Sequence, residues 1–541
     1  MNVPEVVEYA RTLPSVVYAE DNLYTCSQDT QERIKEKIRE HNLNRVVVAS
    51  CTPRTHEPLF QETIREAGLN RYLFTMANIR DQCSWVHMQE KEAATEKAKD
   101  LVRMAVAKSG LLKPLKQYSV QVIPAALVVG GGIAGLTAAL NLAQQGFEVH
   151  LVEKQKELGG LARKIHWTMS GENVPGKLAE LIERASKDPR IHLHLSCEIE
   201  EVFGSVGDFT TRILEKDSGK REEIKHGAAV IAIGGREYQP KEYLYGEDNR
   251  VLTLLELEQK LAQRDRGLSS IRSAVFIGCV GSRNEERPYC SRVCCSETIK
   301  CILKLKELNP GVNVYVLYRD VRTYGFHEDG YREAREKGVT FIRYEPEKPP
   351  LVGRKGERLE VRVLEPGLGE EIRLEADLLG LAAAIVHPED NTRLAQFFKV
   401  PLDANGFFME AHMKLRPVDF ATDGVFLCGL AHNPKTIDES IDQALAASSR
   451  AALLLSRGTL TSEGTVAHID KSLCSGCQQC VRVCPFEAIS FIEEEGVAEV
   501  NEALCKGCGN CAAACPSGAC SLRGFEDRQI VAQIEALAGV A

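Results

Sequence analysis

Eight of the 19 cysteines stand in two copies of one pattern near the carboxyl end of the chain. The copies are Cys474-x2-Cys477-x2-Cys480-x3-Cys484-Pro485 and Cys505-x2-Cys508-x2-Cys511-x3-Cys515-Pro516. Two-residue spacing lets one loop place three thiolates around a cubane of iron and sulfide, while the cysteine before proline reaches the other cubane. We therefore predict two [4Fe–4S] clusters, held by Cys474, Cys477, Cys480 and Cys515 and by Cys505, Cys508, Cys511 and Cys484. Structural zinc sites would not require interlocked fours of cysteine with these prolines.

A second chemical signal is a glycine turn between an expected strand, over residues 126–129, and an expected helix. It reads Leu127-Val-Val-Gly130-Gly131-Gly132-Ile133-Ala134-Gly135. The first glycine permits a tight turn, Gly132 lets a pyrophosphate approach the backbone, and Gly135 lets helix and strand pack closely. The amino end of the helix offers free N–H groups and a positive dipole to the phosphates. The turn alone is a weak signal, because a plain structural turn can look the same.

Three further segments indicate that the dinucleotide bound at this turn is FAD. The next expected strand ends in Glu153-Lys154, about 20 residues on, where a ribose hydroxyl needs an acceptor. Gly159-Gly160 follows, a pair typical of flavin sites, and residues 422–429 match the strand that returns to the flavin in two-dinucleotide-domain flavoproteins. We predict FAD, bound by these residues: Gly130, Gly131, Gly132, Ile133, Ala134, Gly135, Glu153, Lys154, Gly159, Gly160, Gly429, Leu430 and Lys435.

The end of the returning strand departs from the pattern of such flavoproteins. They carry Gly-Asp there, with the acid holding the ribityl chain, whereas this chain has Gly429-Leu430. A helix with a Thr436-x-x-Glu439 capping box follows. Its dipole could point at the pyrimidine end of the flavin and favour the anionic reduced form. We interpret this as a retuned flavin site.

A second strand-and-turn unit opens at Ala274, where a pyridine nucleotide would normally bind, but it lacks the three-glycine pattern. Four cysteines lie within seventeen residues instead: Cys279, Cys290, Cys294 and Cys295. Four thiolates suffice for one cubane, so we predict a third [4Fe–4S] cluster here. The alternative is a redox dithiol with the other cysteines buried, but that chemistry would be expected in a Cys-x-x-Cys.

Length, composition and charge limit the class of protein. The 541 residues suffice for several domains, and the net charge of −9 argues against nucleic acid as a partner. We expect no membrane association and a cytoplasmic protein, because the chain has no leader-like start and no apolar run of about 18 residues. In the reducing cytosol, 19 cysteines indicate metal or redox use and not disulfides.

The order of expected elements predicts an α/β protein of four parts. They are an N-terminal α/β domain (residues 1–115), an FAD-binding domain (120–245 plus 405–457), a second Rossmann-like domain with the cysteine set (246–404) and a bacterial-type 2[4Fe–4S] ferredoxin domain (465–525). A long amphipathic helix is expected over residues 91–108 and one short helix over 527–541.

These motifs, with several longer strings, resemble the A-type subunit of heterodisulfide reductase, a flavin-bearing iron–sulfur protein of methanogens with homologues in anaerobic bacteria. The resemblance covers nearly the whole chain. Its strings lie at residues 46–60, 76–87, 279–283, 289–295, 318–325, 414–420 and 428–432.

The resemblance implies a thioredoxin-reductase-like, two-dinucleotide-domain fold around FAD, and electron bifurcation as the activity. A two-electron donor would reduce the flavin, which sends one electron to ferredoxin and one towards a disulfide or other acceptor at a partner subunit. The implied partners are B/C-like subunits, ferredoxin and a hydrogenase- or dehydrogenase-type input subunit, in a hetero-oligomer; a further expectation is dimerisation through this subunit. The family's cluster in the second Rossmann unit maps onto the four cysteines above, a lysine near the flavin ring onto Lys300, and a carboxylate opposite it, loosely, onto Glu256.

Two departures and two rivals stay open. Longer family members insert another ferredoxin-like domain and begin with a Cys-x-Cys-Gly segment, neither of which is found here; Cys26, Cys51 and Cys83 could share a cluster or be buried thiols. One rival is a self-contained NAD(P)H-dependent oxidoreductase like the small subunit of glutamate synthase, which would need a second intact glycine turn. The other is a passive relay whose flavin does not turn over.

Overall fold

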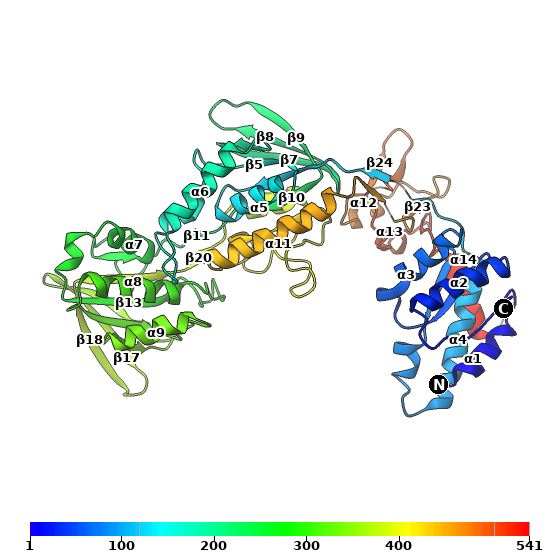
Figure 1. Cartoon of the computed structure of the whole chain (residues 1–541), viewed down its shortest axis with the longest axis horizontal. Coiled ribbons are helices and arrows are strands. Elements are labelled where there is room, and N and C mark those ends of the chain that lie inside the picture. The colour runs from blue at the N-terminus through cyan, green and yellow to red at the C-terminus, as the bar shows by residue number, and fades with distance from the viewer. Residues whose placement is uncertain (118, 462, 503, 540–541) are drawn as a thin grey trace. The chain divides into compact units, whose positions relative to one another are not determined.

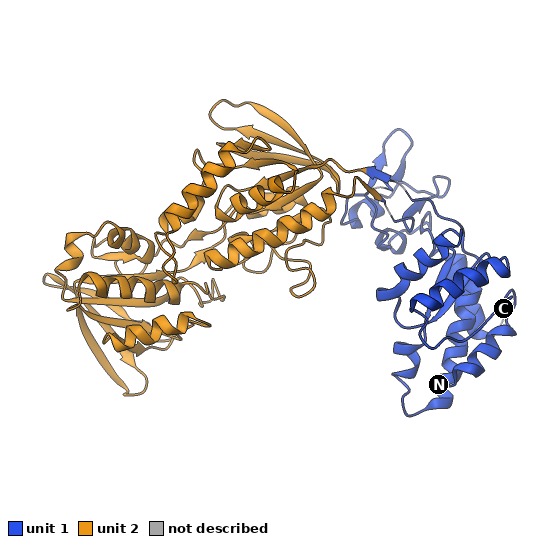
Figure 2. Ribbon diagram, in the orientation of Figure 1, with its two compact units in different colours: residues 1–120, 461–541 blue, residues 121–460 orange. Residues whose placement is uncertain are grey.

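The computed structural model describes residues 1–541 apart from 118, 462, 503 and 540–541 (Figure 1). The chain divides into two compact units, one of residues 1–120 with 461–541 and one of residues 121–460 (Figure 2). In the described part of the chain, no helix combines the length and the apolar character that crossing a bilayer requires.

The larger unit contains two layered domains, and the first of them is built in three layers. A parallel sheet in the order β21-β10-β4-β5-β6 forms the middle layer. Its strands are β4 (Ala125–Val129), β5 (Glu148–Val152), β6 (Ile191–His194), β10 (Ala228–Ile231) and β21 (Val425–Leu427). Helices α5 (Ile133–Gln144), α6 (Val174–Lys187) and α11 (Ile437–Leu455) cover one face (Figure 1). The antiparallel strands β7 (Cys197–Ser205), β8 (Asp208–Glu215) and β9 (Arg221–His226) cover the other.

The alternation of β4 explains why both faces are buried. Ala126 and Val128 pack among the helices, whereas Leu127 and Val129 pack against the antiparallel strands. Successive side chains of a strand point to opposite faces, so an entirely apolar strand suits a sheet covered on both sides. The sequence-predicted strand at 126–129 is therefore the centre of this domain.

The second domain of this unit has the same three-layer arrangement. Its parallel sheet runs β12-β19-β13-β14-β15, made of β12 (Val251–Thr253), β13 (Ser273–Val280), β14 (Asn313–Tyr318), β15 (Thr340–Arg343) and β19 (Leu378–Ala383). Helices α7 (Leu254–Ala262) and α8 (Cys294–Leu308) pack on one face, with α9 (His327–Glu336) beside α8. Strands β16 (Leu351–Lys355), β17 (Arg358–Glu365) and β18 (Glu370–Ala376) pack on the other. Two layered domains of dinucleotide-binding type in one unit agree with the two-dinucleotide-domain fold predicted from the sequence.

Two short antiparallel strands, β11 (Arg236–Glu237) and β20 (Ile385–Val386), carry the chain out of the first domain and back. Helix α10 (Asn391–Phe398) follows the return, and Leu394, Ala395 and Phe398 pack in the core of the first domain. The order of elements in the sequence predicts residues 391–404 in the second domain. In the structure, the apolar side chains of α10 instead pack in the core of the first domain.

The smaller unit joins an α/β region to the cysteine-rich module. Parallel strands β1 (Val46–Ser50) and β2 (Phe74–Asn78) pair among α1 (Val3–Arg11), α2 (Gln28–Glu40), α3 (Pro53–Glu66) and α4 (Lys91–Gly110). The expected helix over residues 91–108 is α4, two residues longer. The final helix, α14 (Asp527–Ala538), packs along α4, where Gln529 Nε2 donates to the Leu111 carbonyl at 3.1 Å.

The cysteine-rich module itself is small and internally repeated. Strands β23 (Ala467–Ile469) and β26 (Cys520–Leu522) pair, as do β24 (Ile489–Ile492) and β25 (Val497–Val500). Short helices α12 (Gln479–Val483) and α13 (Asn510–Ala513) follow the two cysteine loops. Its core is formed largely by cysteine and small apolar side chains, which suits a module packed around bound clusters.

Candidate functional site: a flavin cavity and three cysteine pockets

The glycine turn between β4 and α5 is shaped for a phosphate. A methyl group on Gly135 would lie 1.8 Å from the Gly130 carbonyl oxygen, so only glycine allows this close packing of helix on turn. A methyl group on Gly132 would meet nothing within 4 Å, so the space beside this backbone is open. Gly132 caps α5 in an extended conformation, and the free N–H groups of the first helical turn face that space. The turn therefore fits a pyrophosphate.

Glu153 follows β5 and is held beside this turn. Its Oε2 accepts the Gly131 N–H at 2.6 Å and its Oε1 accepts the Gln155 N–H at 2.8 Å. Glu153 as a whole is 8% exposed. Its neighbour Lys154 forms an ion pair with Asp390 at 2.5 Å, so it is tied to the segment before α10. The acid thus stands where the sequence predicts a ribose acceptor.

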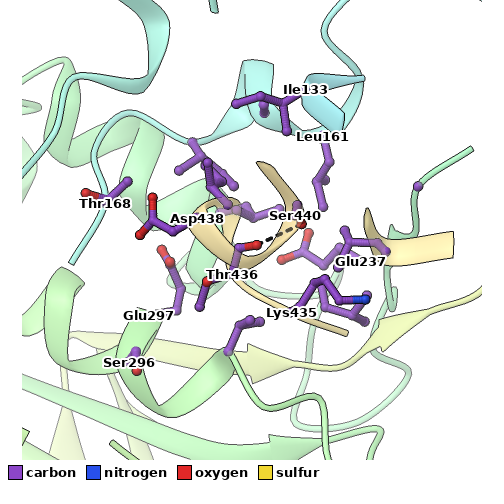
Figure 3. Close-up of a pocket in the computed structure, with 18 of the residues that line it drawn as sticks. Ile133, Leu161, Thr168, Glu237, Ser296, Glu297, Lys435, Thr436, Asp438 and Ser440 are labelled. Carbon is purple, nitrogen blue, oxygen red and sulfur yellow. Dashed lines mark hydrogen bonds between the residues drawn. The ribbon is translucent and has the colours of Figure 1, made fainter. Parts of the chain in front are cut away.

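An open cavity extends from the glycine turn into the space between the two layered domains. Its empty volume is about 1290 Å³, with the open mouth included. Figure 3 labels lining side chains from three elements: Ile133 at the start of α5, Ser296 and Glu297 on α8, and Thr436, Asp438 and Ser440 at the amino end of α11. Of the predicted flavin and catalytic residues, the lining includes Gly132, Ile133, Ala134, Gly159, Leu430, Lys435 and Lys300.

The amino end of α11 closes one side of the cavity, and the expected capping box is present. Thr436 Oγ accepts the Glu439 N–H at 3.2 Å, and Glu439 accepts the Thr436 N–H at 2.9 Å. Lys435 Nζ donates to the carbonyl oxygens of Gly429 at 2.8 Å and Asn433 at 3.3 Å. Burial lowers the pKa of Lys435 to about 7. Where relatives of this fold carry an acid, the site therefore has Leu430 and a buried lysine.

Lys300 occupies a buried ionic site on the opposite wall. Its Nζ lies 3.0 Å from Glu258 Oε2 and 2.8 Å from Glu297 Oε2, and it donates to the Trp167 carbonyl at 2.8 Å. Burial alone would lower the pKa of Lys300, but Glu297 and Glu258 outweigh it and the pKa is raised. Burial raises the pKa of Glu297, against the opposing effect of Lys300 beside it. Lys300 is thus held as a cation at the cavity wall.

Glu256 is placed elsewhere. Its Oε2 accepts the Thr253 N–H at 2.8 Å in the capping box of α7, and its Oε1 accepts the Tyr245 hydroxyl at 2.9 Å. The α7 carboxylate beside Lys300 is that of Glu258, two residues further along the helix, which is fully buried. Two residues along a helix turn the side chain to a different face. The Thr253-x-x-Glu256 pattern could have signalled that Glu256 is used as a cap.

Two further residues of the cavity carry no recognisable sequence pattern. Glu237, on the crossing strand β11, points into the cavity (Figure 3), and burial raises its pKa to about 7. His327, at the start of α9, lines the cavity and its Nδ1 lies 2.9 Å from Ser296 Oγ. Both come from segments far apart in the chain, so only the fold brings them to the flavin turn.

Three of the four cysteines of the predicted third set lie together in a pocket beside α8. Cys279, Cys294 and Cys295 line this pocket, whose empty volume is about 370 Å³. Cys290 is not part of the lining, but its thiol lies within electrostatic reach of the Cys294 thiol. Cys294 also lines the flavin cavity, so one thiol belongs to the walls of both spaces.

An arginine connects the loop between Cys290 and Cys294 to the amino end of α11. Arg292 Nη1 donates to the Pro434 carbonyl at 3.1 Å, and its Nη2 lies 2.5 Å from Glu439 Oε1 and 2.8 Å from the Tyr324 hydroxyl. Glu439 is the acid of the α11 capping box. The loop between Cys290 and Cys294 is thereby held against the amino end of α11.

The ferredoxin-type module has two cysteine pockets, and each contains one of the predicted interlocked sets. One is lined by Cys484, Cys505, Cys508 and Cys511, with an empty volume of about 320 Å³. The other is lined by Cys474, Cys477, Cys480 and Cys515, with about 310 Å³. Among the described residues, no three His, Cys, Asp or Glu side chains are placed to ligate a single metal ion. Thiolates around a four-iron cubane stand farther apart than ligands of one ion.

The three N-terminal cysteines lie in different surroundings. Cys83 is fully buried in an apolar core with Val6 and Val102, and burial raises its pKa. Cys26 is exposed and Cys51 is partly buried, and both lie within electrostatic reach of Arg80.

Comparison with known proteins gives the class and then the family. A model of NAD(P)-binding Rossmann-like domains matches residues 128–179, and a model of 4Fe-4S dicluster domains matches residues 473–519. With the flavin cavity and the paired cysteine pockets, these matches define an iron–sulfur flavoprotein oxidoreductase.

Two relatives from methanogens give the family. The chain is 38% identical to an A-type iron–sulfur subunit of CoB–CoM heterodisulfide reductase from Methanopyrus kandleri, over 92% of this chain and 89% of that one. It is 39% identical to the A-type subunit of the H(2):CoB-CoM heterodisulfide,ferredoxin reductase of Methanothermobacter thermautotrophicus, over 99% and 94%. The chain belongs to the family of A-type heterodisulfide reductase subunits, oxidoreductases that act on sulfur groups.

The family resemblance, the fold class, FAD and the [4Fe–4S] clusters of the ferredoxin-type module, all predicted from the sequence, are thereby confirmed. The alignment with the Methanothermobacter protein spans 632 positions, more than the 541 residues of this chain, so that relative carries segments this chain lacks. Among solved structures, Lactococcus lactis thioredoxin reductase matches at 15% identity and a TM-score of 0.45, over 62% of this chain and 99% of that one.

Proposed function

We propose that the chain is the electron-distributing subunit of a heterodisulfide-reductase-type complex and that its flavin bifurcates electrons. A two-electron donor would deliver to the flavin, one electron would leave towards ferredoxin, and the other towards a partner subunit that reduces a disulfide or other acceptor. The name of the Methanothermobacter relative joins H(2), CoB-CoM heterodisulfide and ferredoxin in one reaction. The proposal extends that combination of reactants to this chain.

The observation that carries the proposal is the position of Cys294. Cys294 lines both the flavin cavity and the third cysteine pocket. We therefore propose a third [4Fe–4S] cluster on Cys279, Cys290, Cys294 and Cys295, next to the flavin. The pocket is of similar size to the two in the ferredoxin-type module, about 370 Å³ against 320 Å³ and 310 Å³.

The residues around the cavity would divide the work of holding the cofactor. Gly132 and the first turn of α5 would bind the pyrophosphate, and Glu153 the ribose. When bound, the flavin supplies exchange between electron pairs and single electrons, which iron–sulfur clusters carry one at a time. Lys300 would place positive charge on one wall of the cavity, and the amino end of α11 would present the positive end of its helix dipole on another. Both would favour a negatively charged reduced cofactor.

Proton supply is the second task of these walls. Glu237 and Glu297, whose pKa values are raised by burial, can hold protons inside the cavity near neutral pH. Electrons that arrive through clusters bring no proton with them, so a flavin reduced in this way needs a proton from the protein or solvent. The two carboxyl groups are our candidates for that role.

The partners follow from the same proposal. We propose that the partners of this chain are B/C-like subunits, ferredoxin and a hydrogenase- or dehydrogenase-type subunit. The ferredoxin-type module would transfer electrons to or from one of them. The rival, a self-contained NAD(P)H-dependent reductase, would need a nucleotide site in the second domain. Near the end of β13, where such a site would have its first glycine, the chain has Cys279 in a left-handed conformation.

The test is a stoichiometry measured on the complex purified anaerobically from its host. With an excess of two-electron donor, reduction of ferredoxin should require the disulfide acceptor, and the two products should form in equal electron amounts. Ferredoxin reduction without the acceptor would contradict bifurcation. Bleaching of the flavin by NADH in the isolated chain would instead support the NAD(P)H-dependent rival.

A further inference from the structure

A short segment of the first layered domain forms part of the wall of the flavin cavity. This segment, residues 165–173, lies between Gly159-Gly160 and helix α6, and we call it the strap. It turns back on itself, because the Val174 N–H after it donates to the His166 carbonyl at 3.3 Å. The strap residues that line the cavity are Ile165, Trp167, Thr168 and Met169, of which Figure 3 labels Thr168.

The side chains of the strap pack on the second domain. Trp167 and Met169 contact its core, which α7, α8 and α9 help to form. A methyl group on Gly330 of α9 would lie 2.0 Å from Met169 Cε, so this glycine leaves the space that Met169 fills. The centre of the Trp167 ring lies 5.5 Å from Lys300 Nζ and 5.9 Å from Lys304 Nζ, within the range of cation–π contacts.

The backbone of the strap is bound by the buried ion pair of the second domain. Glu258 Oε1 accepts the His166 N–H at 2.7 Å and the Trp167 N–H at 3.2 Å. Lys300 Nζ donates to the Trp167 carbonyl at 2.8 Å and lies 3.0 Å from Glu258 Oε2. Hydrogen bonds with one charged partner are about twice as strong as neutral ones. Two side chains of one domain therefore hold both N–H and C=O groups of a segment from the other.

We propose that Glu258 and Lys300 are positioning residues that hold the strap against the second domain, and thereby keep the wall of the flavin cavity and the two layered domains in one arrangement. Three hydrogen bonds to the backbone act together with the packing of Trp167 and Met169. A cavity that keeps its shape would keep a bound flavin at a constant distance from groups of the second domain. This inference goes beyond the proposed function and depends neither on bifurcation nor on a third cluster.

The test is hydrogen–deuterium exchange of the full chain after anaerobic reconstitution, measured by mass spectrometry on peptides that cover residues 165–173. Lys300→Met removes the donor to the Trp167 carbonyl. Lys304→Met is the matched control, because Lys304 lies on the same helix beside the same ring but pairs with Glu307. We expect the strap to exchange about tenfold faster or more in Lys300→Met and at the parent rate in Lys304→Met.

A substitution of the carboxylate separates its two tasks. Glu258→Gln keeps a carbonyl oxygen that can accept the two strap N–H groups, but it loses the charge that pairs with Lys300. Glu258→Leu loses both. We expect strap exchange in Glu258→Gln to lie between that of the parent and that of Glu258→Leu.

A second readout follows the strap through its own side chain. The chain has two tryptophans, and Trp85 is 59% exposed. In a Trp85→Phe background, the tryptophan fluorescence therefore comes from Trp167 alone. Quenching of this fluorescence by acrylamide should increase in Lys300→Met and stay at the parent value in Lys304→Met.

A variant that leaves the ion pair intact tests the role of packing. Trp167→Ala removes the ring and keeps the backbone groups that Glu258 and Lys300 bind. We expect the strap in this variant to exchange within about threefold of the parent rate.

Two outcomes would overturn the proposal. Equal strap exchange in the parent and in Lys300→Met would show that the ion pair does not hold the strap. Exchange in Trp167→Ala as fast as in Lys300→Met would show that the packing of the ring holds it instead. If peptides from α8 and β13 also lose protection in Lys300→Met, that variant has unfolded, and the exchange rate in Trp167→Ala decides between the two accounts.

Discussion

The two layered domains of residues 121–460 have the same plan and different chemistry at the same place. In the first, β4 ends at Val129 and α5 begins at Ile133, so only the glycine turn separates them. In the second, β13 ends at Val280 and α8 begins only at Cys294, after a loop that carries Cys290. The strand end and helix start that present a phosphate site in one domain present thiols in the other. The scaffold fixes where the chemistry happens, and the residues at the turn decide which chemistry it is.

The largest effect is expected from substitution of Cys294, which lines both the flavin cavity and the third cysteine pocket. Cys294→Ser should remove the third cluster, lowering iron by about four per chain and deleting its EPR signal. Cys197→Ser is the control, because Cys197 is a buried thiol outside the three sets. Equal iron content in parent and Cys294→Ser would contradict the assignment of a cluster to the second domain.

Flavin content should respond almost as strongly to the glycine turn. In Gly132→Ala the new methyl group meets no protein atom within 4 Å, so the fold should be kept while the space for the pyrophosphate is filled. We expect bound FAD to fall by about tenfold or more, measured by absorbance after gel filtration. Gly353→Ala, also free of neighbours, is the control. Full FAD content in Gly132→Ala would place the phosphates elsewhere.

Loss of the Lys300 cation from the cavity wall should lower the free energy of unfolding. Lys300→Met leaves Glu258, which is fully buried, without its cation, and such a loss costs about 3–5 kcal/mol. Chemical unfolding of the apoprotein measures it. Lys337→Met, an exposed lysine paired with Glu333, should change stability by less than about 0.5 kcal/mol. Similar effects of the two variants would argue against a structural role for the Lys300–Glu258 pair.

Lys435 should make the apoprotein more stable as the pH rises. Its pKa is lowered to about 7 by burial, from an ordinary value near 10.5, so between these values the unfolded chain binds a proton that the folded chain does not. Stability then rises with pH in this window, by up to about 1.4 kcal/mol per pH unit. Cys428, Arg292, Glu439 and Glu410 act on the same lysine. Lys435→Met should remove this part of the slope, and an unchanged slope would show that Lys435 is not the titrating group.

The smallest effect separates the two neighbouring acids of α7. Glu256→Gln should weaken the capping box by about 1 kcal/mol at most and leave the flavin spectrum unchanged. Glu258→Gln should change the spectrum or the potential of the flavin, because it alters the charge beside Lys300. The reverse result would return Glu256 to the site.

The sequence predicted best what depends on local spacing. The interlocked cysteine sets, the glycine turn with its helix and the capping box at Thr436 each need only residues close together in the chain, and the structure brings each set together. The strand at residues 126–129 was also predictable, because an entirely apolar run suits a sheet buried on both faces.

What escaped prediction depends on contacts across the fold. Glu258, rather than Glu256, meets Lys300 because α7 and α8 pack with that face inward. Glu237 enters the cavity from a two-residue crossing strand that has no sequence signature. Helix α10 joins the first domain because its apolar stripe fits that core, which no property of its own sequence reveals.

The most direct test of a cluster beside the flavin is a crystal structure of the anaerobically reconstituted chain, with diffraction data collected at the iron absorption edge. We expect an anomalous peak of cubane size in the pocket of Cys279, Cys294 and Cys295, and an isoalloxazine ring in the adjoining cavity that Cys294 also lines. A disulfide or empty thiols in that pocket, with iron only in the ferredoxin-type module, would contradict it.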